Sequence, residues 1–534
     1  MLSLALSALK AAPAVWSISI AAAAKIARVL LAIALALLDR FFFSFFTKRD
    51  PPVKRVAVIG GGIAGFGAAW ALARSGVEVT LLEAADEVGG NAKTIAWPDG
   101  KVTGLSVLAW PAVYFRNYKA LLSALAIETA PVELPFYIRR ADGEAFAHGR
   151  DAHLSRRYAG DLRRWSYLVA FVRRVNAFFA GKGAPLSLYH MSLLNPLNAV
   201  PLRLACALFG ISSGFYHDLI VPLYASSFLS TDLAMTPLVI VPIIDDLIST
   251  HAVPSMESWK GSSRDVFSRM AADTACIGAL KVRAGRRVGF AFRDPADGRW
   301  AITCIGAEPE FFSGFDRVVF AAGARAAADA LPNTWAWTAA RLLLRSVAYC
   351  GGPAFAKGVV HSDASVLPAD LRADLLRSYA NYIEEFGGGG GAGRRYENTF
   401  ILSSWYPAVQ SDADDEGENG RLSGSDVRPP PMARLVTYDC RHPERLKGVV
   451  GEVRNEWNHP VLSPLNLLVA LLLRLLQGRR GAYYAGSMST PGNGHDLSLC
   501  SGFAAAAAIG AEYPFAADAD AAADFARLRG IMGL

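Results

Sequence analysis

Val53–Glu83 reads VKRVAVIGGGIAGFGAAWALARSGVEVTLLE, and this stretch decides the fold. Residues 53–60 are dense in β-branched side chains and predict a short strand. An alanine-rich segment that ends at Gly76 predicts a helix, and residues 77–82 predict a second strand. The order of strand, G-x-G-x-x-G loop, helix, strand and acid predicts a βαβ unit that binds a dinucleotide.

Each glycine of the loop has a separate task in such a unit. Gly60 permits the tight turn after the strand, Gly62 lets the backbone approach the pyrophosphate, and Gly65 lets helix and strand pack closely. Ile63 and Ala64 open the helix, whose N-terminus offers free N–H groups and a positive dipole end to the phosphates.

A carboxylate and a glycine pair follow the second strand. Glu83 stands where a carboxylate can accept hydrogen bonds from both ribose hydroxyls. The acid followed after a few residues by Gly-Gly resembles the flavin amine-oxidase superfamily, which includes protoporphyrinogen oxidases, carotene desaturases and carotenoid isomerases. The resemblance implies that the dinucleotide is FAD and that the glycine pair passes close to the flavin. Where the superfamily usually has Arg or His after the pair, this chain has Asn. The cofactor-binding residues assigned to this segment are Glu83, Ala84, Gly89, Gly90 and Asn91.

Two middle segments extend the resemblance. Residues 281–303 predict two strands joined by an Asp-Gly turn, and the resemblance assigns to Val288 a backbone contact beside the adenine. A further strand ends at Ala322 and Gly323, and its D-x-V-V-x-A-x-G pattern is similar to a second dinucleotide-side signature of the superfamily.

The C-terminal segment carries the candidate catalytic residues. A predicted strand ends at Gly486 and Ser487, and this serine replaces the acid usual in the superfamily. His495 and Asp496 follow, before a predicted helix whose free N–H groups are expected over residues 499–503 to face the flavin. The ending G-x-G-H-D is similar to a subgroup that includes polyenoic fatty-acid isomerases. No metal-ligand pattern occurs in the sequence.

The predicted fold is α/β, with a Rossmann-type FAD-binding domain interleaved with an α+β substrate domain and preceded by a hydrophobic segment. The predicted ranges are 1–50 for the hydrophobic anchor or targeting segment, 53–140, 265–330 and 480–520 for the FAD-binding domain, and 141–264 and 331–479 for the substrate domain.

Residues 1–47 are almost wholly apolar and are followed by a basic cluster. Three interpretations stay open: a membrane anchor, a targeting segment that is removed, and an amphipathic helix on a membrane surface. We expect a membrane-associated protein of the endoplasmic reticulum or a plastid, with the catalytic part on the cytosolic or stromal side. We also expect the segment to be separate from the fold.

The composition indicates which kinds of binding partner can be excluded. Hydrophobic residues make up 52 % of the 534 residues and charged residues 19 %, with a net charge of +7. No nucleic-acid recognition motif accompanies the charge, so we expect no nucleic-acid partner. The six cysteines are scattered and predict buried side chains, not a disulfide framework or zinc site.

The sequence thus predicts an FAD-dependent oxidoreductase that transfers hydride from a hydrophobic small molecule, a lipid or fatty acid, to flavin N5. One alternative is a redox-neutral isomerase that shifts double bonds in polyunsaturated fatty acids. Another is a flavin-binding subunit of a membrane complex without enzymatic activity.

Overall fold

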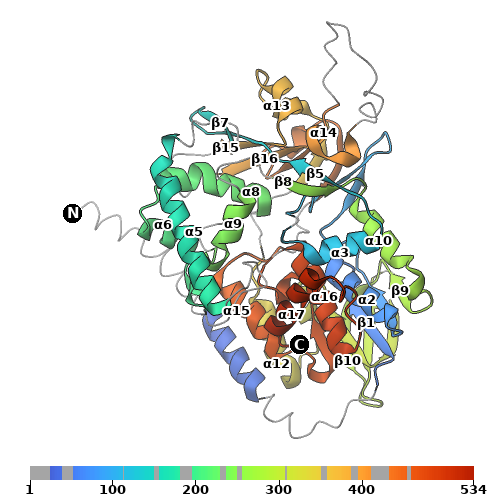
Figure 1. The fold of residues 1–534 in the computed structure, drawn as a ribbon. Helices are drawn as coiled ribbons and strands as arrows, with labels where there is room; N and C mark the ends of the chain where they lie inside the picture. The colour runs from blue at the N-terminus through green and yellow to red at the C-terminus, as the bar shows by residue number, and fades with distance from the viewer. Residues whose placement is uncertain are drawn as a thin grey trace.

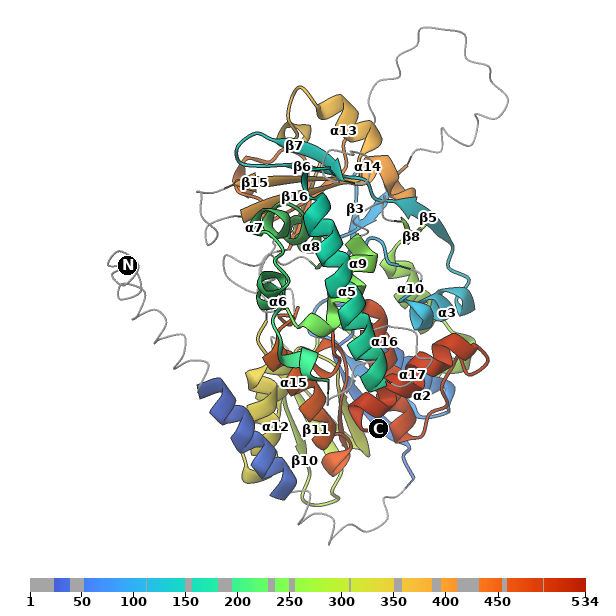
Figure 2. The same ribbon diagram turned by 60° about the vertical axis from the view of Figure 1, so that its left-hand side comes forward.

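A five-stranded parallel sheet forms the lower half of the molecule in Figures 1 and 2, in a computed structural model of the chain. Its strands, in spatial order, are β19 (Ala482–Tyr484), β13 (Arg317–Phe320), β1 (Arg55–Ile59), β2 (Glu78–Leu82) and β9 (Leu280–Arg283). The structure describes residues 24–38, 52–111, 113–148, 156–180, 195–228, 236–248, 255–306, 309–349, 358–386, 395–410, 432–453, 459–492 and 494–534. Segments from both ends of the chain therefore build one sheet.

Two helices cover one face of this sheet and pack unusually closely. They are α2 (Ile63–Arg74) and α16 (His495–Ile509). A Cβ at Gly502 of α16 would lie 2.1 Å from the Ala64 carbonyl oxygen, and a Cβ at Gly65 would lie 1.9 Å from the Gly60 oxygen. Since no side chain fits at either contact, the glycines determine how closely the helices and strand approach.

The opposite face is covered by a small antiparallel sheet and by helices. The hairpin predicted within residues 281–303 is present as β10 paired with β11, with β12 added, but residues 281–283 belong to β9 of the parallel sheet. These elements are β10 (Arg287–Arg293), β11 (Trp300–Ile305), β12 (Glu310–Phe315), α11 (Ala324–Ala330), α12 (Trp335–Ser346) and α15 (Pro464–Leu472).

Residues 24–38 form a helix that joins this layer (Figure 2). Val29, Ala32 and Ala36 are buried in the same hydrophobic cluster as the sheet, and Arg479 donates from Nη1 to the Ala36 carbonyl oxygen at 3.1 Å. The expectation that the N-terminal segment is separate from the fold is therefore wrong for residues 24–38. None of the described helices combines the length and apolar character needed to cross a bilayer. Residues 1–23 and 39–50 of the predicted segment lie outside the described residues.

A seven-stranded sheet forms the upper half of the molecule (Figure 1). In spatial order it contains β18 (Val449–Val453), β14 (Gly358–His361), β17 (Leu435–Tyr438), β16 (Arg395–Ile401), β15 (Asn381–Phe386), β6 (Phe136–Arg139) and β7 (Ala145–His148). Here β6 pairs in parallel with β15, whereas every other neighbouring pair is antiparallel. Thus β6 belongs to the second sheet, although it falls within the range 53–140 predicted for the cofactor domain.

Helices stand beside and between the two sheets. They are α3 (Arg116–Ala124), α5 (Ala159–Ala180), α6 (Leu202–Leu208), α8 (Val221–Phe228), α9 (Val241–Ile248), α10 (Ser263–Ala271), α13 (Arg372–Ser378), α14 (Leu402–Trp405) and α17 (Ala519–Met532). A two-stranded ribbon joins β5 (Thr129–Glu133) to β8 (Ser255–Trp259). The predicted α/β class with a Rossmann unit is confirmed, while the domain boundaries and the role of the second region stay predictions.

Candidate active site

A cavity of about 1100 Å³ brings together residues from both sheets and from the helices between them. This volume exceeds the roughly 300–1,000 Å³ of a typical small-molecule site, so a dinucleotide and a substrate can share it. Fifteen predicted residues line it: Gly60, Gly62, Ile63, Ala64, Glu83, Ala84, Gly89, Gly90, Asn91, Ala322, Gly323, Gly486, Ser487, His495 and Asp496. Gly65 and Val288 do not line it.

Within the glycine loop, a side chain would find open space at Gly62 and no space at Gly65. A Cβ at Gly62 would meet only the Cα of Gly90, at 3.8 Å, and it would stand at the cavity wall. Gly65, by contrast, is closed by the Gly60 carbonyl. The α2 helix begins at Ile63, so its N-terminal N–H groups lie at the same wall. This cradle of bare backbone fits a pyrophosphate group.

Glu83 is held by the backbone at the cavity edge. Its Oε2 accepts from the Gly61 N–H at 2.6 Å, and its Oε1 accepts from the Ala85 N–H at 2.8 Å. Carboxylate oxygens have a further lone pair each, so both can also accept from neighbouring ribose hydroxyls. The predicted position of this acid is thus consistent with a ribose contact.

The predicted adenine contact at Val288 is not placed in the cavity. Val288 packs against the hydrophobic cluster of the lower sheet, and the preceding residue, Arg287, lines the cavity instead. Successive residues of a strand point to opposite faces, which places these two neighbours on different sides. The contact between the Val288 backbone and the adenine remains a prediction. Arg287 lines the cavity and was not predicted from the sequence.

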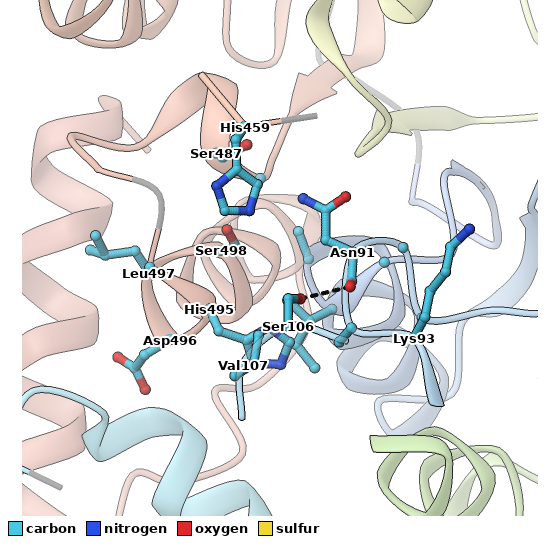
Figure 3. A pocket seen from close by; sticks show the side chains of 18 of the residues that line it. Asn91, Lys93, Ser106, Val107, His459, Ser487, His495, Asp496, Leu497 and Ser498 are labelled. Carbon is cyan, nitrogen blue, oxygen red and sulfur yellow. Dashed lines mark hydrogen bonds between the residues drawn. The ribbon is translucent and has the colours of Figure 1, made fainter. Parts of the chain in front are cut away.

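The α16 helix begins earlier than predicted. It starts at His495 after Gly494, and the Ser498 N–H already donates to the Gly494 carbonyl oxygen at 3.0 Å. The N–H groups without an intrahelical partner are therefore those of residues 495–497, and the expectation of residues 499–503 is wrong. Figure 3 shows this end of the helix at the cavity, where its positive dipole end favours a negative charge.

His495 lies in the first turn of this helix, in an aromatic environment. Its ring stands edge-on to Tyr118, with centroids 4.8 Å apart and planes at 86°. Burial lowers the pKa of His495 to about 3, so the ring is neutral at physiological pH. The hypothesis of a cationic His495 is therefore wrong for this arrangement, whereas a neutral ring that donates one hydrogen bond is consistent with it.

Asp496 holds a neighbouring helix. Its Oδ1 accepts from the backbone N–H of Tyr118 at 2.5 Å, and Tyr118 lies in the first turn of α3. In Figure 3 the carboxylate is directed towards α3. Asp496 thus caps α3 from another element, which is a different role from the predicted orientation of His495 or capping of its own helix.

The cavity wall contains a strained residue beside the predicted Asn91. Val107 has φ +57°, a left-handed conformation that β-branched residues rarely adopt. The preceding Ser106 donates from Oγ to the Asn91 carbonyl oxygen at 2.7 Å (Figure 3). This bond joins the Gly-Gly-Asn turn to the loop before Val107, and no sequence pattern signals it.

The end of the cavity away from the glycine loops is apolar and aromatic. Its lining side chains are Tyr114, Phe115, Leu134, Phe136, Ile240, Ile243, Ile244, Met256, Phe400, Trp405, Tyr438 and Leu462. His459 also lines the cavity, and burial lowers its pKa to about 4. Both imidazoles of the cavity are therefore neutral at physiological pH, and the apolar end offers little stabilisation to a charged ligand.

Sequence comparison identifies the N-terminal unit. Residues 58–125 match the family model of the NAD(P)-binding Rossmann-like domain. A stretch of 47 residues is 56 % identical to an L-amino-acid oxidase of Pseudechis australis. The match spans 9 % of this chain and 9 % of the oxidase, so it concerns a short segment of both proteins.

Structural comparison covers most of the chain. A fatty acid isomerase from P. acnes, described as producing CLA, matches 84 % of this chain and 97 % of its own at a TM-score of 0.56 and 14 % identity. Putrescine oxidase matches 86 % and 99 % at a TM-score of 0.56 and 14 % identity. Cyclohexylamine oxidase from Brevibacterium oxydans matches 86 % and 99 % at a TM-score of 0.54 and 16 % identity. At these identities the matches establish a shared fold.

Proposed function

This chain has the fold of the flavin amine-oxidase superfamily, and from that premise we propose that it is an FAD-dependent oxidoreductase acting on a hydrophobic, lipid-like substrate. The comparisons support both the enzyme class and FAD as the cofactor. The observation that carries the proposal is the single cavity with bare backbone and Glu83 at one end and apolar side chains at the other.

The residues of the cofactor end hold FAD in this proposal. The pyrophosphate lies against the cavity wall at Gly62, and Glu83 accepts hydrogen bonds from the ribose hydroxyls. The N-terminus of α16 faces the flavin. When bound, the flavin supplies a hydride acceptor, so substrate oxidation needs no covalent chemistry from the protein.

The chain's own residues orient the substrate and exclude water. The apolar end binds a hydrocarbon chain, since burial of apolar surface is favourable at about 25 cal/mol per Å². The neutral His495 donates one hydrogen bond, and the positive dipole end of α16, which begins at His495, stabilises negative charge as it develops. Each contact strengthens during reduction and thereby lowers the barrier.

A redox-neutral fatty-acid isomerase is the second candidate. The apolar end of the cavity and the similarity of the fold to a fatty acid isomerase favour it. In that reaction a hydride leaves an allylic carbon and returns to another carbon of the same chain, so no external acceptor is consumed.

Anaerobic incubation with linoleic acid separates the candidates. We expect flavin bleaching with one equivalent of oxidised lipid if the protein is an oxidase or dehydrogenase. A conjugated isomer formed over many turnovers without an acceptor would identify an isomerase. Bound flavin that is not bleached, with no lipid product formed, would favour the non-enzymatic flavin-binding membrane subunit. The Gly62→Val variant, expected to lack flavin, is the matched control for lipid chemistry without cofactor.

Membrane association, through an endoplasmic-reticulum or plastid membrane, remains part of the proposal. The burial of Val29, Ala32 and Ala36 changes how it is tested, because removal of residues 1–47 would uncover the hydrophobic cluster of the lower sheet. Truncation before residue 24 preserves that contact. Membrane fractionation of this shorter deletion, compared with the full chain, tests the contribution of residues 1–23.

A further inference from the structure

The outer face of α5 combines aromatic and basic side chains. Tyr167 is 69 % exposed and Phe178 is 81 % exposed, with Phe171 between them also exposed. Arg163 and Arg174 are exposed on the same side. Their spacing of three or four residues places all five on one stripe of the helix.

The α6 helix continues this surface. Leu204 and Leu208 are exposed, Leu208 to 75 %, and Arg203 is exposed beside them. The rings of Phe171 and Phe209 lie 5.8 Å apart and join the two helices. We call this surface the α5–α6 face, and it consists of Arg163, Tyr167, Phe171, Arg174, Phe178, Arg203, Leu204 and Leu208.

The α5–α6 face has no acidic side chain. Asp161, the single acid in the sequence of α5, is buried and accepts from Ser212, and α6 contains no acid. Apolar side chains interspersed with arginines alone match a bilayer with anionic head groups, in which the apolar groups enter the interface and the guanidinium groups contact phosphates.

The face lies directly outside a wall of the cavity. Trp165 of α5 donates from Nε1 to Asp245 of α9 at 2.6 Å, and Arg173 pairs with Asp246 at 2.7 Å. On the same α9 helix, Ile243 and Ile244 line the apolar end of the cavity. One helix therefore separates the α5–α6 face from the site proposed for the substrate.

We propose that the α5–α6 face docks the protein onto an anionic lipid surface, with the apolar end of the cavity beside the membrane. This inference goes beyond the proposed function because docking does not depend on which reaction the flavin supports. It also differs from an N-terminal anchor, since every residue of the face lies between positions 163 and 208.

Vesicle co-sedimentation of the full-length protein tests the proposal. The probe is phosphatidylcholine vesicles containing phosphatidylglycerol, with pure phosphatidylcholine vesicles alongside. The double variant Phe178→Asp/Leu208→Asp should bind more than about 100-fold more weakly, because it removes two large apolar groups from the interface. The triple variant Arg163→Gln/Arg174→Gln/Arg203→Gln should lose about 100-fold on the anionic vesicles and little on the neutral ones.

Matched controls lie on the opposite side of the molecule, near α10 and β9 in Figure 1. Ile277 is 76 % exposed and Leu208 75 %, so Ile277→Asp replaces an aliphatic side chain by a carboxylate at nearly the same exposure as Leu208→Asp does. It should bind vesicles as the wild type does. Flavin content and melting temperature, measured for every variant, confirm that the fold is intact.

Three outcomes would overturn the proposal. If the wild-type protein does not sediment with anionic vesicles, an anionic lipid surface is excluded as the partner of the α5–α6 face. Equal binding by wild type and face variants would assign membrane binding to residues 1–23 or another surface. Sedimentation velocity that shows a wild-type dimer and a monomeric Leu208→Asp variant would make the face an interface between two copies.

Discussion

The two ends of the cavity recognise their ligands by different means. At the cofactor end the contacts come mainly from backbone and from Glu83. Many belong to the continuous βαβ unit of residues 55–83, and the N-terminus of α16 adds to them. At the apolar end the wall is made by single side chains from β6, α9, β8, β16 and β17. A substitution at the cofactor end therefore removes one defined contact with the ligand. A substitution at the apolar end instead makes a small change in the shape of the cavity wall.

The largest expected effect is loss of the cofactor in Gly62→Val. The new side chain meets little of the protein, because Gly90 Cα at 3.8 Å is the nearest atom, and it occupies the place of the pyrophosphate. We expect a folded protein without flavin absorbance. Gly65→Val is the contrasting variant: its Cβ would lie 1.9 Å from a carbonyl oxygen, so it should fail to fold. Stoichiometric FAD in a purified Gly62→Val protein would refute the assignment of the loop.

The next largest effect is expected for His495→Ala. Loss of one hydrogen-bond donor at the flavin should slow flavin reduction by roughly 10–1000-fold while flavin content hardly changes. Because burial lowers the pKa of His495 to about 3, the wild type and the variant should show parallel rate profiles between pH 6 and 8. Stopped-flow reduction measures both quantities. An inflection near pH 6.5 in the wild type alone would show that His495 titrates in the working range.

Glu83→Ala should weaken FAD binding by roughly 1–3 kcal/mol, the cost of losing a charge-assisted hydrogen-bond partner. Glu83→Gln keeps the shape and one acceptor, so it should lose less. Titration of the apoprotein with FAD gives the dissociation constants. If both variants bind FAD as the wild type does, the carboxylate contacts only Gly61 and Ala85.

Asp496→Ala should lower the free energy of unfolding by about 1–2 kcal/mol, because the first turn of α3 loses its cap. The rate of reduction per bound flavin should stay at the wild-type value. Thermal or denaturant unfolding and stopped-flow measurements on the same preparation test this. A slower rate at unchanged stability would instead restore the predicted role of Asp496 in orienting His495.

The smallest effect is expected at the apolar end. Met256→Leu conserves volume in the wall and should cost less than about 1.5 kcal/mol of stability, with unchanged FAD content. Turnover of linoleic acid, or of any substrate identified, should change only slightly. A loss of flavin in this variant would contradict the separation between the two ends.

Local patterns explain why much of the cofactor end was predictable. Gly60, Gly62, Gly65 and Glu83 are fixed by spacing within one βαβ unit, and the structure brings the lining members together. The predicted start of α16 was wrong because the residue at its N-cap position, Gly494, has no side chain that could signal a cap. Serines within the next turns resemble N-caps and shifted the predicted start.

The apolar end could not be predicted because it depends on register between distant segments. Ile243, Met256 and Phe400 meet only after α9, β8 and β16 pack, and each alone reads as an ordinary core residue. The same holds for the cap of α3 by Asp496, which joins two elements far apart in sequence. The strain at Val107 likewise comes from tertiary contacts.

The order of strands in the lower sheet also determines when the sheet and its cavity can be completed during synthesis of the chain. The glycine loop at residue 60 is synthesised long before the segments that complete its site, because its sheet is completed by β19 and its cavity by α16, near residue 495. At about 5–20 residues per second, roughly 20–90 s of synthesis separate the glycine loop from the start of α16. Once β13 has been made, its edge that later receives β19 stays unpaired until residues 482–484 follow, so cofactor capture and full burial of the sheet are expected only after α16 has been synthesised.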